Sequence, residues 1–69
     1  MYTKEEIKEY LEDMLKTSIF GRSAIINNIV IYFNEYRFAE TYNKKTILYL
    51  IHNNILIAEM NIENITSII

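Results

Sequence analysis

Hydrophobic and polar positions along the chain change their spacing near Gly21. Before that residue, apolar side chains recur every three or four positions and form one helical stripe: Ile7, Tyr10, Leu11, Met14 and Leu15. After it, β-branched and aromatic residues dominate and the helical period is lost. The change predicts a single α+β domain, with an amphipathic helix at 3–18 packed on an antiparallel sheet at about 25–60.

Both ends of the predicted helix carry sequence signals. Thr3 and Glu6 have the spacing of a capping box, in which each side chain accepts a hydrogen bond from the other residue's backbone N–H. Tyr2 and Ile7 stand where a hydrophobic staple forms. Gly21, the only glycine, can adopt the left-handed conformation that ends many helices, so we expect the helix to stop before it.

Four segments have the composition of strands: 29–33, 36–42, 47–52 and 55–60. Asn53-Asn54 separates the last two, and asparagine tolerates the positive φ angles of a two-residue hairpin. The segments predict a meander of three or four antiparallel strands. Residues 62–69 fit either a last short strand or a helical turn.

Two stretches of the chain resemble each other. Ile25–Ile31 and Ile51–Ile57 both place an Asn-Asn pair between aliphatic residues. The likeness is compatible with two related turn-and-strand units. It is equally compatible with chance in a chain of fourteen isoleucines and eight asparagines.

The residue inventory excludes most catalytic chemistry. The chain has 69 residues and no cysteine, and His52 is its only histidine, so disulfides, cysteine zinc sites and histidine clusters cannot form. One glycine is too few for a phosphate-binding loop. A lone histidine beside a turn also lacks the partners of a nucleophilic triad. We therefore expect no metal, no cofactor and no enzymatic activity.

The chain shows no membrane or export signal. Its longest apolar runs are five residues, at 29–33 and 47–51, whereas about 20 are needed to cross a bilayer. We therefore expect a cytoplasmic protein.

The net charge of −2 lies entirely in residues 1–18, which carry five acidic and three basic residues. Four of these acids form a candidate partner-binding face of the helix: Glu5, Glu9, Glu12 and Asp13. Carboxylates spaced along a helix can imitate nucleic-acid phosphates and enter a basic groove of another protein. The alternative is an ordinary solvated helix face.

A segment rich in aromatic and basic residues is the alternative binding site. Three aromatic residues are expected to share one face of the predicted strand 36–42, because alternate residues of a strand point the same way. Three basic residues accompany them, and the set is Tyr36, Arg37, Phe38, Tyr42, Lys44 and Lys45. Such a set can stack on and neutralise single-stranded nucleic acid. The competing interpretation is that the rings form the core beneath the helix. An acidic chain with a pI of about 5.2 also makes nucleic acid an unlikely partner.

The predicted sheet has more apolar residues than one helix can cover. Ile47, Tyr49 and Ile51 alternate with Leu48 and Leu50, so both faces of this strand are apolar. A surplus apolar face generally marks an interface. A chain this short also gains from association. We therefore expect the outer face or an edge of the sheet to bind protein, either a target or a second copy in a homodimer.

In size and composition the whole chain resembles small phage-encoded inhibitors of host defence, of the anti-CRISPR type. It shares with them a small acidic domain without cysteine, rich in isoleucine, asparagine, lysine and tyrosine. No motif carries the resemblance, so it transfers no site residue. It implies a non-enzymatic viral protein that acts in the host cytoplasm as an inhibitor of a larger host complex.

Overall fold

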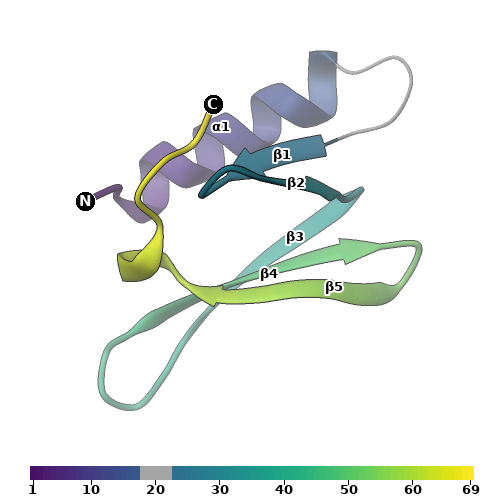
Figure 1. Ribbon diagram of the computed structural model, residues 1–69. Coiled ribbons are helices and arrows are strands. Elements are labelled where there is room, and N and C mark those ends of the chain that lie inside the picture. The colour runs from purple at the N-terminus through teal and green to yellow at the C-terminus, as the bar shows by residue number, and fades with distance from the viewer. Residues whose placement is uncertain (18–22) are drawn as a thin grey trace.

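The structure, a computed structural model, describes residues 1–17 and 23–69. Its elements are α1 (Lys4–Thr17), β1 (Ser23–Ile26), β2 (Ile29–Tyr32), β3 (Glu35–Glu40), β4 (Thr46–His52), β5 (Ile55–Asn61) and the 3-10 helix η1 (Ile62–Asn64). β1 and β2 form a two-stranded antiparallel sheet, and β3, β4 and β5 form a three-stranded one (Figure 1). The α+β class is confirmed, although the strands divide between two sheets instead of forming one meander.

The predicted capping box begins α1. The backbone N–H of Thr3 donates to Glu6 Oε1 at 2.9 Å, and the N–H of Glu6 donates to Thr3 Oγ1 at 3.1 Å. The hydrogen bond from the Thr3 backbone N–H, followed by the interaction with the Thr3 side chain, lowers the pKa of the Glu6 carboxyl. The described part of the helix extends to Thr17, and both the predicted end at residue 18 and Gly21 lie outside the described residues.

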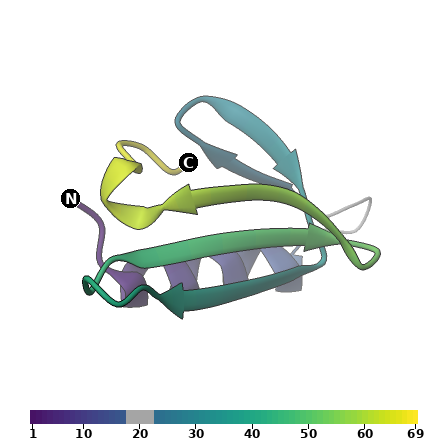
Figure 2. The same cartoon turned by 90° about the horizontal axis from the view of Figure 1, so that it is seen from below.

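The core lies between α1 and the inner face of the three-stranded sheet. Ile7 and Leu11 of α1 are fully buried in one cluster with Leu48 and Leu50 of β4. Ala24, Ile26, Phe33 and Ile65 complete this cluster. α1 and the β1–β2 hairpin lie side by side over the three-stranded sheet (Figures 1 and 2).

Two tyrosine hydroxyls fix α1 to both sheets. The Tyr10 hydroxyl accepts the backbone N–H of Ile25 in β1 at 2.8 Å. The Tyr36 hydroxyl in β3 donates to the Glu12 carboxylate. The helix therefore covers the side of the molecule where β1 and β3 lie, whereas β2 and β5 face each other on the opposite side (Figure 2).

The two Asn-Asn pairs make equivalent turns. Asn27 and Asn28 have φ angles of 52° and 66°, and Asn53 and Asn54 have 51° and 67°. Positive φ at both central residues defines the type I′ hairpin, whose twist matches that of the strands. The predicted hairpin at Asn53-Asn54 is confirmed. The similarity between the two stretches also proves structural, because Asn27-Asn28 joins β1, which was not among the predicted strands, to β2.

Two other boundaries differ from the sequence prediction. β3 ends at Glu40, so Tyr42 lies in the turn before β4. Residues 62–69 combine both predicted alternatives, since η1 is followed by an extended tail in which Ile68 bridges to Ile26 of β1.

The turn geometry predicts opposite effects for two substitutions of Asn54. Alanine at a φ of 67° should destabilise the protein by roughly 1 kcal/mol or more, because a Cβ is unfavourable in the left-handed region. Asn54→Gly should be neutral or stabilising, since glycine adopts this conformation without strain. Thermal unfolding measures both variants, and equal melting temperatures would contradict the assigned turn.

The buried helix stripe predicts that Leu11→Asp abolishes the cooperative fold. The leucine is fully buried, and the substitution places a charge in the core without a partner. Lys8→Asp introduces the same side chain at an exposed position of α1 and is the matched control. Circular dichroism during urea titration should show a cooperative transition for the control only.

Candidate functional site

The structure separates the four acids of the predicted helix face. Glu5, Glu9 and Asp13 are exposed. Glu12 is half-buried and accepts the hydrogen bond from Tyr36, so it belongs to the contact between helix and sheet. Three solvated carboxylates therefore remain on this face.

The aromatic rings of the alternative site lie beneath the helix. Tyr36 and Phe38 are half-buried against the core, with ring centroids 5.8 Å apart in an edge-to-face arrangement. Lys4 of α1 places Nζ 5.5 Å from the centre of the Phe38 ring. Arg37 points to the opposite face of β3, as alternation requires, and pairs with Glu35 at 2.8 Å.

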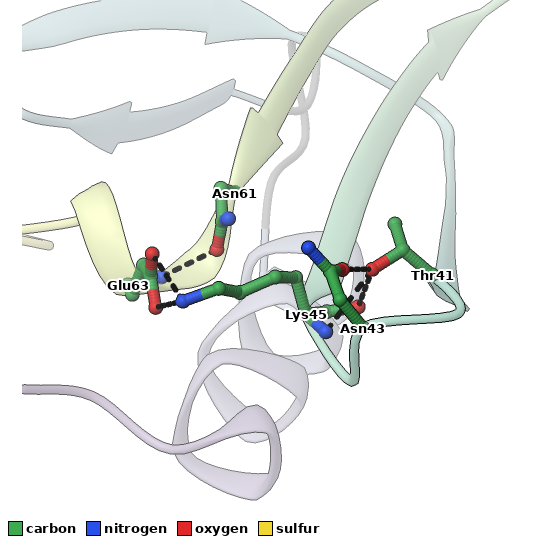
Figure 3. A network of polar contacts seen from close by, with 5 residues as sticks. All are labelled: Thr41, Asn43, Lys45, Asn61 and Glu63. Atoms are coloured by element: carbon green, nitrogen blue, oxygen red, sulfur yellow. Dashed lines mark hydrogen bonds and ion pairs between the residues drawn. The ribbon is translucent and has the colours of Figure 1, made fainter.

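The remaining residues of that set lie at the turn before β4. Tyr42 is fully exposed, and Lys44 is exposed with a φ of 65°. Lys45 pairs with Glu63 of η1 at 2.9 Å, in a polar cluster that includes Thr41, Asn43 and Asn61 (Figure 3). The six residues therefore do not share one surface.

An apolar groove separates β2 from β5. Its volume is about 540 Å³, within the range of ligand-binding cavities, and no Asp, Glu, Lys or Arg side chain lines it. The lining residues are Ile29, Val30, Ile31, Tyr32, His52, Ile57, Ala58 and Met60. β2 and β5 are edge strands of their sheets. In an antiparallel ladder only alternate residues bond to the neighbouring strand, so each edge keeps unpaired backbone groups.

Exposed apolar side chains extend from the groove along both strands. Six of them keep between 50% and 64% of their surface accessible: Ile29, Val30 and Tyr32 of β2, and Ile55, Leu56 and Ile57 of β5. We call these six residues the apolar strip. Its residues belong to the second strands of the two Asn-Asn hairpins.

Asparagine side chains hold the two walls of the groove together at both ends. At one end Asn34, after β2, donates to Asn53 Oδ1 at 2.8 Å and accepts the Asn53 backbone N–H at 3.1 Å. At the other end Asn27, before β2, donates to the carbonyl of Asn64 at 3.0 Å and accepts the N–H of Thr66 at 2.7 Å. The groove is therefore preformed.

The sequence analysis expected the surplus apolar surface on the outer face or an edge of the sheet, and the apolar strip follows the edge strands β2 and β5. On the outer face of β4, Ile47, Tyr49 and Ile51 are only half-buried. Tyr49 has Arg37 and Glu59 as its cross-strand neighbours, so polar side chains border this face. The missed signal is the absence of any charged residue from 23 to 34, which leaves β2 without the charges that protect most edge strands.

Neither a metal centre nor a membrane span is found in the part of the chain that the structure describes. Within residues 1–17 and 23–69, no three side chains of His, Asp or Glu gather to hold a metal ion. No helix among the same residues is long and apolar enough to cross a bilayer.

Comparisons with models of known families, with curated proteins and with solved structures found no match. The functional inference therefore depends on the geometry of the chain itself.

The bond between Tyr36 and Glu12 predicts a stability difference that depends on pH. The Glu12 carboxylate, as hydrogen-bond acceptor, together with burial, raises the pKa of the Tyr36 hydroxyl from 10.0 to about 12. The folded state therefore favours the protonated phenol. The stabilisation of the fold by the Tyr36–Glu12 hydrogen bond is complete below pH 10 and is lost as the pH rises through 12. Tyr36→Phe should cost about 1 kcal/mol at pH 8.

Urea unfolding at several pH values tests this prediction. The difference in unfolding free energy between the wild type and Tyr36→Phe should shrink between pH 10 and 12. A difference that stays constant from pH 8 to 12 would show that the hydroxyl does not act through this bond.

Proposed function

We propose that this protein is a non-enzymatic protein-binding module that takes an extended, apolar segment of a partner protein at the groove between β2 and β5. The observation that carries the proposal is the apolar strip, which flanks a preformed groove between two sheet edges. An added strand satisfies the unpaired backbone groups of an edge, and its alternate side chains fill the neighbouring apolar surface. The groove offers both features at the same place.

The extent of the apolar strip favours a protein over a small molecule. Ile55 and Leu56 do not line the groove, yet both expose more than half of their surface beside it. A small ligand inside the groove would leave these side chains in water. Contiguous exposed apolar surface of this kind is typical of protein interfaces.

Inhibition of a larger host complex is the form of activity that we propose for this module. A protein that occupies a strand or a strand-binding edge of its target excludes the target's own partner from that place. The solvated carboxylates of Glu5, Glu9 and Asp13 lie on α1, and their negative field would speed encounter with a basic target. This mode of action agrees with the resemblance in size and composition to phage-encoded inhibitors.

We do not propose the nucleic-acid alternative, since no observation favours it. The rings of Tyr36 and Phe38 pack beneath α1, and Lys45 is paired with Glu63. Stacking on bases requires exposed ring faces beside free cations.

Affinity capture with defined variants tests the proposed surface. Tyr32→Lys and Ile57→Lys each place a charge in the groove and should reduce capture of a host protein by at least about tenfold. Tyr42→Lys changes a fully exposed ring that does not line the groove and should retain capture. Bound partner should also protect backbone amides of β2 and β5 from hydrogen exchange.

Two results would contradict the proposal. One is a partner that all three lysine variants capture equally well. The other is capture of oligonucleotides alone, with binding weakened by salt and by Lys44→Glu.

A further inference from the structure

We infer that the segment bound at the groove is β2 of a second copy of this chain, so that two copies associate through their β2 edges about a two-fold axis. This inference rests on the proposed function and names the occupant of the same site in the isolated protein, where no host target competes for it. In such an interface the same surface serves both subunits, so it must be complementary to itself.

The chemistry of β2 meets this requirement. No charged residue occurs between positions 23 and 34, and none of the groove's lining residues is acidic or a lysine or arginine. A second β2 therefore brings no unpaired charge into the apolar strip, whereas a charged strand would have to be desolvated there. In the dimer, apolar side chains of the other copy would replace water around three exposed residues of each β2: Ile29, Val30 and Tyr32.

The other free edges are less suited to self-pairing. β3 carries Glu35, Arg37 and Glu40, and charged side chains are a common protection of edge strands. The ladder between β4 and β5 shifts register near Leu50, and such an irregularity disturbs a straight edge. β2 is regular over its four residues and carries no such protection.

Backbone alternation also defines a register for the pair. If the residues next to the turn, Ile26 and Ile29, exchange hydrogen bonds as in other two-residue hairpins, then the backbone groups of Val30 and Tyr32 point away from β1. Antiparallel pairing of two β2 strands then sets Val30 opposite Tyr32 of the second copy, with Ile31 on the two-fold axis. The product is one four-stranded sheet in the order β1, β2, β2, β1.

The exposed area approaches what a stable dimer buries. The chain exposes 4914 Å², whereas a folded monomer of 8.3 kDa is expected to expose about 4,600 Å². The six side chains of the apolar strip offer on the order of 80 Å² each, or roughly 500 Å² together. Standard interfaces bury about 800 Å² on each partner. The strip supplies more than half of that area, and the backbone edge and flanking turns can supply the rest.

Sedimentation velocity across a range of concentrations tests the association. The wild type should sediment as a species of twice the 8.3 kDa chain mass at micromolar concentration. Val30→Lys should weaken dimerisation at least about 30-fold, because it places a charge at the centre of the interface. Tyr42→Lys should change the dissociation constant less than about threefold. Circular dichroism establishes whether each variant is folded.

Crosslinking supplies a test that does not depend on a destabilising charge. The natural chain has no cysteine, so introduced thiols report only the designed pair. The double variant Val30→Cys/Tyr32→Cys should form a disulfide-linked dimer under mild oxidation. Tyr42→Cys/Lys44→Cys, with the same spacing at an exposed turn, should remain largely monomeric.

The outcomes separate the inference from the proposed function. A chain that stays monomeric to 100 µM or so, and does not crosslink through β2, overturns the inference. The proposed function survives that result if Tyr32→Lys still abolishes capture of another protein. A dimer that Val30→Lys leaves intact, with no crosslink between β2 strands, also overturns the inference. The proposed function fails only if Tyr32→Lys and Ile57→Lys capture a partner protein as well as Tyr42→Lys does.

Discussion

The structure depends on the burial of α1 against β4. The chain has no cysteine for a disulfide, and burial of apolar surface is the dominant favourable contribution to folding. Ile7 and Leu11 reach complete burial only because Leu48 and Leu50 present an apolar surface at the right face of the sheet. The hydroxyls of Tyr10 and Tyr36 then set the position of the helix against both sheets.

The same arrangement explains why one side of the molecule is apolar and open. The edges of the two sheets approach each other on two sides of the molecule, and both sides need cover. Residues 1–17 and 23–69 contain one long helix to supply it. α1 covers the side with β1 and β3, so β2 and β5 keep exposed isoleucine, valine and tyrosine side chains. The asparagine contacts at the two ends keep these strands apart at a fixed spacing. The candidate site is therefore a consequence of how the core is built.

Local signals in the sequence were sufficient for the helix and for one hairpin. The capping box depends on residues three positions apart, and the Asn53-Asn54 turn depends on two adjacent residues, so both can be read without tertiary information. The division into two sheets could not be read in this way. Residues 25–33 are almost continuously apolar, and such a run has no period that distinguishes the faces of a strand.

For the same reason, the candidate site could be predicted from the sequence only in part. The composition of the chain was enough to predict surplus apolar surface. The position of that surface depends on which strands lie next to each other in the fold, here β2 and β5. Glu12 illustrates the same limit of sequence-based prediction. Its position in the helical repeat groups it with the exposed charged residues of α1, but its hydrogen-bond partner, Tyr36, is 24 residues away in the sequence. The similarity between Ile25–Ile31 and Ile51–Ile57 was the strongest unused signal, because it marks both walls of the groove.

The position of the C-terminal tail has a consequence for how the protein is made. Ile65 is part of the buried core, Ile68 bridges to β1, and Asn27 bonds to Asn64 and Thr66. During translation the β1–β2 hairpin therefore emerges from the ribosome about forty residues before the segment that completes it. Until residues 64–69 have left the exit tunnel, an uncharged β strand remains without its final contacts. The nascent chain is then exposed to proteases and aggregation, and the emergence of residues 64–69 ends that period.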